Sequence, residues 1–313
     1  MRIVVLAGGL STERDVSISS GIKVASALRE KGNEVVLLDV FMGYEENFCD
    51  IDALFKHNYS FTDSLGVGTE IPDIKTVKEN RLDKSSKFIG MNVIEICAEA
   101  DITYLALHGG EGENGQIQAT LDLFGIKYTG SGYLGSALAM NKALTKSVLI
   151  QNRVTTPAGR VYKSAQDAED WSYYPCVVKP CSGGSSVGIT KAENRAEYLE
   201  SVKEAFKYEK EIVVEQFVEG REFSVGVIGG RALPLRLRLF LRQVSTIMWQ
   251  SIRQAQQTKF ALLTLLQARM MFFVKLPRLR LRLSTCRAMQ ELTLFLIKYR
   301  VRLIVLRQTH FPV

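Results

Sequence analysis

The distribution of glycine most limits what this chain of 313 residues can fold into. All 24 glycines lie before position 235, and the 79 residues from Leu235 to Val313 contain neither glycine nor aspartate. These residue types build many of the tight turns in proteins, so the tail has little from which to make loops. The tail also holds 15 of the 40 Lys and Arg residues but one of the 33 acidic residues, so residues 1–234 are net acidic although the chain as a whole carries +7. The sequence therefore predicts ordered domains followed by an aberrant C-terminal third.

Length and cysteine content narrow the class of protein. The chain is long enough for two or three domains, and 46% of its residues are hydrophobic, as in soluble globular proteins. Its five cysteines are an odd number without a CxxC pair, which indicates a reducing compartment and argues against structural zinc. The apolar run after Met1 is too short for a signal peptide, and no stretch approaches the roughly 18 apolar residues of a membrane span. We expect a cytoplasmic protein.

The first segments predict a parallel α/β sheet. Arg2–Leu6 and Glu34–Val40 have the apolar runs of strands, and residues 17–31 carry apolar side chains at helical spacing. Such an order places a site at the carboxyl ends of the strands. The Gly8-Gly9 turn suits an anion at a helix N-terminus, although simple strand-to-helix geometry also explains it. Residues 43–90 are polar and irregular, and the pattern assigns them no structure.

A histidine stands out at the end of the next predicted strand, Ile102–Leu107. A lone histidine is usually structural, but His108 is followed by four glycines in seven residues, where side chains project into a site. Helical spacing resumes in Gln116–Phe124, and one helix is expected from about Ser136 to Gln151. That helix carries Lys142, which is either a binding residue or merely solvated.

The segment Val177–Ile189 combines a strand end with a loop suited to a nucleotide triphosphate. Glycines let backbone N–H groups approach an anion, Ser185 and Ser186 add hydroxyl donors, and Lys179 adds a fixed positive charge. The Walker pattern is absent, because no Gly-Lys-Ser/Thr follows at the required spacing. A plain Ser/Gly linker is the alternative.

Two glutamates flank an apolar segment further on. Strands are predicted at Val161–Tyr162, Cys176–Lys179 and Glu211–Glu215, the last continuing to Val225. Glu215 and Glu222 are spaced as acids that hold adenine or ribose donors would be, and two surface carboxylates are the alternative.

Taken together, residues 1 to about 234 resemble the D-alanine–D-alanine ligase family of ATP-grasp enzymes. Six motifs in family order carry the resemblance, and the sixth consists of Glu215 with Glu219–Val225. The others are Ala7–Gly9 with Thr12–Ser17, Ala106–Gly115, Tyr128–Gly132, Met140–Lys142 and Lys179–Gly188. The resemblance implies an α/β fold, an ATP-grasp ligase with an N-terminal Rossmann-like (pre-ATP-grasp) domain. It divides the chain into a substrate-binding domain (1–130), a central ATP-grasp subdomain (131–214) and a C-terminal ATP-grasp subdomain (215–313). From about residue 236 the last subdomain departs from the family pattern, and a change of reading frame, described below, explains the departure.

The resemblance also implies catalytic residues. Glu13 and Ser17 would help hold the first D-alanine, and His108 would lie near its reacting carboxylate. Ser185 and Ser186 would belong to the loop that closes over the transferring phosphate. In this family ATP phosphorylates the carboxylate of the first D-alanine, and the amine of the second attacks the acyl phosphate, for peptidoglycan synthesis. Neutralised phosphoryl charge and exclusion of water are the physical demands of that reaction.

The nucleotide site follows in the same way. Lys142 and Lys179 would contact the ATP phosphates, Glu215 the adenine and Glu222 the ribose, with Val218 in the same site. The implied cofactors are ATP and Mg²⁺, and the implied partners are ATP and D-alanine in a homodimer without nucleic acid or membrane.

The family pattern stops at Pro234, and the genetic code explains why. In the alternative reading frame, each codon consists of the last base of one codon of the present frame and the first two bases of the next. The residue that such a junction encodes is called hidden. Met248 and Trp249 have single codons, so their junction must encode valine, and Trp249 with Gln250 must encode alanine. Junctions over 243–252 permit Gly-Phe-Tyr-Asp-Tyr-Val-Ala-Lys-Tyr, the family's loop. Those over 304–313 permit Cys-Leu-Glu-Ala-Asn-Thr-Phe-Pro-Gly, the family's metal-binding end. Two matches in one frame and in family order indicate a reading-frame change.

The frame change removes the metal ligands. The hidden aspartate, glutamate and asparagine fall at the junctions 292/293, 306/307 and 308/309, where this chain has no carboxylate for a hard dication. We expect no metal ligands, no activity in this chain, and a tail whose apolar spacing matches no sheet or helix face. A ligase for another acceptor such as D-lactate is one alternative. A genuine basic module for nucleic acid or a membrane surface is another.

Overall fold

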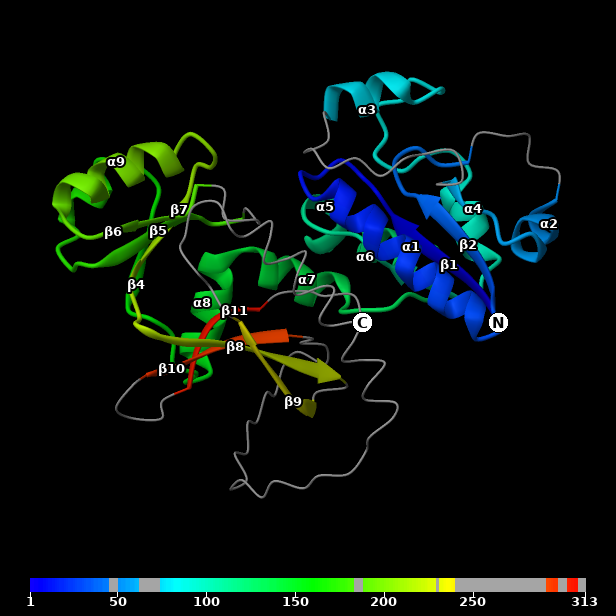
Figure 1. Ribbon diagram of the computed structural model, residues 1–313. Helices are drawn as coiled ribbons and strands as arrows, with labels where there is room; N and C mark the ends of the chain where they lie inside the picture. The colour runs from blue at the N-terminus through cyan, green and yellow to red at the C-terminus, as the bar shows by residue number, and fades with distance from the viewer. Residues whose placement is uncertain are drawn as a thin grey trace.

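The computed structural model describes residues 1–44, 50–61, 74–182, 188–228, 231–239, 291–297 and 303–308, with side chains up to residue 220. Within these residues three sheets follow one another along the chain (Figure 1). No helix of the described part is long and apolar enough to cross a membrane.

The first sheet is parallel and has the order β2-β1-β3. Its strands are β2 (Glu34–Asp39), β1 (Arg2–Ala7) and β3 (Ile102–Leu105). Alternate residues of β1 and β2 enter two different hydrophobic cores, one on each face. Strands buried on both faces have continuous apolar runs, which is why the sequence predicted all three to within two residues.

Helices cover both faces of this sheet. On one face α1 (Arg14–Glu30) packs against β1 and β2, and on the other α4 (Val93–Ala98) and α6 (Gln116–Leu123) supply core residues. The approach of α1 is close, since a β-carbon at Gly21 would lie 2.7 Å from that of Ala7. Glycine at this position therefore lets the helix lie against the strand.

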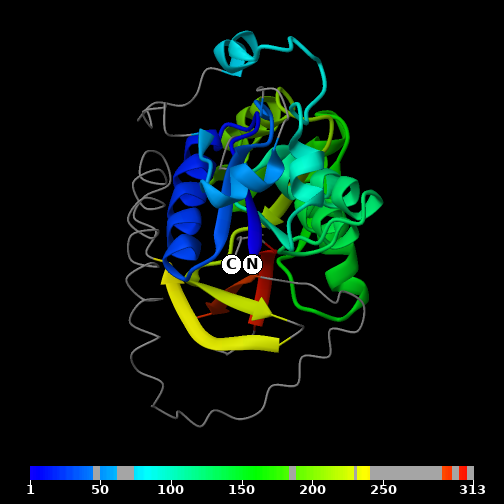
Figure 2. The same cartoon turned by 90° about the vertical axis from the view of Figure 1, so that its right-hand side faces the viewer.

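The segment without a sequence assignment contains two short helices. In α2 (Ile51–Lys56) the side chain of Phe55 is fully buried, whereas α3 (Ile74–Asn80) buries nothing and stands apart from the sheet in both views (Figures 1 and 2). The chain after α3 is fastened by Arg81, which is 1% exposed, lies 4.6 Å from the ring of Phe41 and donates to two backbone carbonyls.

One helix expected from the sequence is two in the structure. The break falls at Asn141, between α7 (Tyr133–Met140) and α8 (Lys142–Gln151), where the backbone is extended. The Asn141 side chain accepts from the backbone N–H of Leu144 at 3.0 Å, which makes it the N-cap of α8. The expectation of one helix was therefore wrong.

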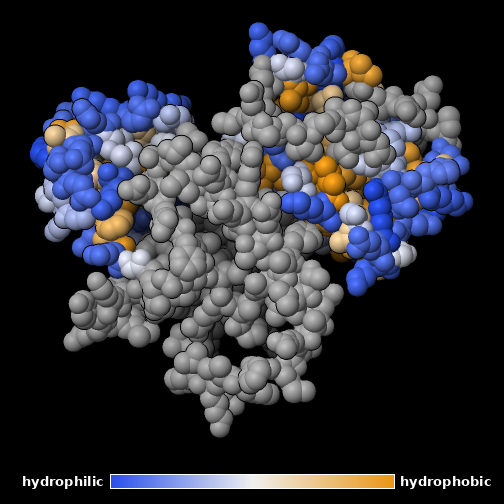
Figure 3. All heavy atoms as spheres, viewed as in Figure 1, coloured by the Kyte–Doolittle hydropathy of each residue, from blue (hydrophilic) through white to orange (hydrophobic). Residues whose placement is uncertain are grey.

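The second sheet is antiparallel, with the order β4-β7-β5-β6. It consists of β4 (Gly159–Tyr162), β7 (Ile212–Gln216), β5 (Cys176–Pro180) and β6 (Thr190–Ala192). The helix α9 (Arg195–Ala205) covers β5 and β6 and closes a separate hydrophobic core. Figure 3 shows mainly hydrophilic residues on the visible outer surface of this unit, while hydrophobic residues gather on the visible face of the N-terminal unit. A short 3-10 helix at Asp167–Asp170 follows β4.

The third sheet is antiparallel, with the order β11-β10-β8-β9. Its strands are β8 (Gly220–Ile228), β9 (Arg231–Leu239), β10 (Glu291–Ile297) and β11 (Leu303–Gln308). Two expectations were wrong here. The strand expected to run through residue 225 is two strands in different sheets, and parts of the tail do form strands. The Leu-Arg alternation in β9 has the two-residue period of a strand, whichever frame encodes it.

Candidate functional site

The carboxyl ends of β1 and β3 lie side by side and bring two glycine motifs together. The chain after β3 enters the short helix α5 (Gly110–Glu113) through Gly109. Gly109 has a φ of +68°, a conformation that favours glycine, and a β-carbon there would lie 2.7 Å from Glu13 Oε2 and push that carboxylate aside. The Ser11 hydroxyl donates to the carbonyl of His108. We call Ser11, Glu13, His108 and Gly109 the strand-end cluster.

A buried ion pair fixes the start of α1 beneath this cluster. Arg14 is 6% exposed and Asp39 is fully buried, and their side chains form a salt bridge. One Asp39 oxygen also accepts from the backbone N–H groups of Phe41 and Met42, at 2.9 and 3.1 Å. Arg14 donates to the carbonyl of Gly9 at 2.7 Å. The pair therefore joins the glycine turn, the first helix and the end of β2.

Ser17 lies inside the fold. Its hydroxyl is fully buried, accepts from the backbone N–H of Gly8 at 2.9 Å and donates to the carbonyl of Ala106 at 2.8 Å. These bonds join the ends of β1 and β3. The structure thus gives Ser17 a bracing contact, and its expected role in holding D-alanine stays a prediction.

The imidazole of His108 faces α1. His108 is half-buried, and its Nε2 lies 3.3 Å from the Ser20 hydroxyl. It follows the end of β3, and its expected role near a reacting carboxylate stays a prediction.

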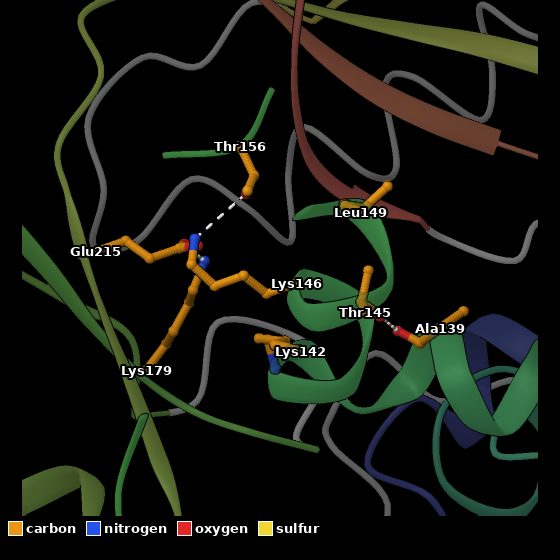
Figure 4. A pocket seen from close by; sticks show the side chains of 8 residues that line it. All are labelled: Ala139, Lys142, Thr145, Lys146, Leu149, Thr156, Lys179 and Glu215. Carbon is orange, nitrogen blue, oxygen red and sulfur yellow. Dashed lines mark hydrogen bonds and ion pairs between the residues drawn. The ribbon is translucent and has the colours of Figure 1, made fainter. Parts of the chain in front are cut away.

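A second cluster lines a small pocket between α8, β5 and β7, which we call the lysine pocket (Figure 4). Three lysines and one glutamate provide its charges. Its lining residues are Ala139, Lys142, Thr145, Lys146, Leu149, Thr156, Lys179 and Glu215. Lys142 and Lys179 both line this pocket, as expected, while the Ser185-Ser186 loop expected at the same cleft lies outside the described residues.

Glu215 lies at the centre of the lysine pocket with a cation on each oxygen. Lys146 Nζ is 2.7 Å from Oε1, and Lys179 Nζ forms an ion pair with Oε2. Burial by itself raises the pKa of Glu215, but the charges of Lys179 and Lys146 outweigh it and hold the pKa below its ordinary value. The carboxylate is therefore ionised although its side chain is only 6% exposed.

Lys142 fastens the end of β5. Its Nζ donates to the carbonyls of Pro180 and Cys181 at 2.9 and 3.3 Å, and its side chain is buried. The ammonium group thus lies where the Ser/Gly loop leaves the strand. Lys146 was missed in the sequence, although it follows Lys142 by four residues and so lies on the same helix face.

The remaining predicted residues are less fully described. Ser185 and Ser186 lie outside the described residues, and Glu222 is described by its backbone alone, within β8. Val218 is half-buried in the connection from β7 to β8. No group of three or more His, Cys, Asp or Glu that would hold a metal occurs in the part of the chain with described side chains.

The fold is that of the ATP-grasp ligases, because the solved structures that it resembles are D-alanine–D-alanine ligases. Residues 2–131 match the family model described as "D-ala D-ala ligase N-terminus", and residues 145–247 match "D-ala D-ala ligase C-terminus". The chain belongs to the D-alanine–D-alanine ligase family.

Individual relatives agree with this assignment. The chain is 45% identical over 240 residues to a D-alanine–D-alanine ligase of Pediococcus pentosaceus, covering 75% of this chain and 67% of that protein. It is 42% identical over 234 residues to one from Lacticaseibacillus casei, covering 74% and 65%. The chain thus spans about two-thirds of the length of the curated relatives that it matches.

Solved structures support the fold. The structure resembles a D-alanine–D-alanine ligase from Bacillus anthracis with a TM-score of 0.59 at 22% identity, over 98% of this chain and 86% of that one. It resembles the B. anthracis ligase complexed with ATP with a TM-score of 0.57 at 21% identity, over 98% and 85%.

Proposed function

We propose that residues 1–234 come from an enzyme that joins two D-alanine molecules at the expense of ATP. The γ-phosphoryl group passes to the carboxylate of the first D-alanine, forming an acyl phosphate and ADP. The amine of the second attacks the acyl carbon. The bond between that carbon and the phosphate oxygen breaks, phosphate leaves with the electron pair, and the amine releases a proton. The strand-end cluster would hold the first D-alanine, and the Ser185-Ser186 loop would close over the phosphate.

The lysine pocket carries this proposal. It places buried cations at the end of β5, where the Ser/Gly loop leaves the strand, and an ionised glutamate one strand away on β7. Cations at that position stabilise the charge on a transferring phosphoryl group. In the proposal, Lys142 and Lys179 serve the phosphates, Glu215 the adenine amino group and Glu222 with Val218 the rest of the nucleoside.

We further propose that the reading frame changes near Leu235, within the C-terminal subdomain (215–313). The match to the Pediococcus pentosaceus relative spans 240 residues, whereas the chain has 313, and this supports the frame change. The magnesium ligands would lie in the other frame. Since no described side chains form a cation site, we assign no step to magnesium here. By the same proposal this chain is inactive, while its in-frame counterpart is a cytoplasmic homodimer for cell-wall synthesis.

Two measurements test the proposal. Resequencing the gene around the codon for Leu235 shows whether the frame changes in the organism. Assaying the chain in both frames with ATP and either D-alanine or D-lactate shows the acceptor. Dipeptide from the restored frame alone supports the proposal. Preferred D-lactate transfer would identify another acceptor. A soluble, active chain in the present frame would make the basic tail a genuine module.

A further inference from the structure

We propose that Lys146 is a positioning residue that keeps the Glu215 carboxylate charged and oriented for the base of the nucleotide. This inference rests on the proposed ATP site and adds a residue that sets base selectivity.

The contacts of Lys146 are those of a fixed group. Its Nζ donates to Glu215 Oε1 at 2.7 Å, to Thr156 Oγ1 at 3.3 Å and to the carbonyl of Pro157. An ammonium group has three hydrogens to donate, and the protein supplies an acceptor for each. Figure 4 shows the Lys146 ammonium beside the carboxylate, with Lys179 reaching it from β5.

The two lysines therefore differ in what they are able to do. Lys179 is more exposed than Lys146, 13% against 7%, and stands directly before the Ser/Gly loop. If Lys179 moves to a phosphate, Glu215 loses one partner. A buried carboxylate left without a counter-charge is strongly unfavourable. Because Lys146 remains on Oε1, Lys179 is able to leave without that penalty.

Base selectivity follows from the fixed carboxylate. Adenine presents an amino group that donates to Glu215, whereas guanine presents a carbonyl oxygen at the same ring position, which a carboxylate repels. A carboxylate that is neutralised or turned away loses this distinction. Lys146 thus acts on the base through Glu215, while Lys179 acts on the phosphates.

The test is equilibrium dialysis of the frame-restored protein against labelled ATP and GTP. We expect Lys146→Met to lower the ratio of ATP to GTP affinity by about tenfold, as for a contact to a charged group. Lys146→Arg, which keeps the cation, should retain most of the ratio. Lys163→Met is the matched control: this lysine pairs with Glu211 on the surface and is 76% exposed, so both affinities should stay unchanged.

A second background separates positioning from mere support of the fold. In Glu215→Gln the carboxylate charge is gone, so adding Lys146→Met should change the ratio by less than about twofold. This double variant buries no unpaired carboxylate, so it tests the coupling even where Lys146→Met alone unfolds. Equal losses for ATP and GTP in Lys146→Met would overturn the inference, as would the full tenfold loss persisting in the Glu215→Gln background. Absence of ATP binding by the frame-restored parent protein would instead refute the proposed nucleotide site itself.

Discussion

Replacing Asp39 by asparagine should strongly destabilise the N-terminal domain. The substitution keeps the size of the side chain but leaves the Arg14 guanidinium, 6% exposed, without its counter-charge. Removing one partner of a buried ion pair typically costs about 3–5 kcal/mol. At about 1.4 kcal/mol per factor of ten, this corresponds to a rise of roughly 100-fold to several thousand-fold in the population of opened molecules.

Hydrogen exchange is the suitable assay, because it reports on one domain in a chain with several. Backbone amides of β1 and β2 in Asp39→Asn should exchange faster by roughly 100-fold to several thousand-fold. The exchange rates of amides in β5 and β7 should not change. The control is Asp52→Asn, which removes an exposed partner of Arg2 and should alter β1 exchange by less than about threefold. Equal exchange in Asp39→Asn and in the control would refute the argument that this pair holds the turn and α1 together.

Three further outcomes are expected. Burial raises the pKa of Cys97 to about 12 and those of Cys176 and Cys181 to about 11, so these thiols stay protonated at pH 8. Iodoacetamide should therefore leave them unlabelled until the chain unfolds, as peptide mass spectrometry would detect. In the frame-restored protein, Lys179→Ala should lower turnover by about two orders of magnitude or more, and near-normal turnover would show that this lysine is not at the phosphates. The present chain should release no D-alanine-dependent phosphate and should aggregate readily, because apolar runs such as 260–266 and 270–274 are encoded without regard to a fold. A soluble, active preparation would contradict this prediction.

The sequence predicted those features that depend on local pattern. Continuous apolar runs identified β1, β2 and β3. The resemblance to the family placed Lys142 and Lys179 at one cleft, and both line the lysine pocket. The strand signal needs no knowledge of distant contacts, because the period of a strand is a property of neighbouring residues.

Features set by distant contacts were not predictable in this way. The segment after α3 is held in place by Arg81, which packs against Phe41, forty residues earlier in the chain. The break between α7 and α8 depends on Asn141 acting as a cap, although good helix formers stand on both sides of it. The bonds of the Ser17 hydroxyl to two backbone groups were not predicted either, because only the sheet brings those groups together.

We propose that this chain carries two-thirds of an ATP-dependent D-alanine–D-alanine ligase whose remaining third lies in another frame. Its most direct test is to restore the frame after Leu235, express the protein, and measure dipeptide and ADP from ATP and D-alanine. We predict D-alanyl-D-alanine and ADP in equal amounts, formed only when both substrates are present. Stable, folded protein that makes no dipeptide from D-alanine would contradict the claim.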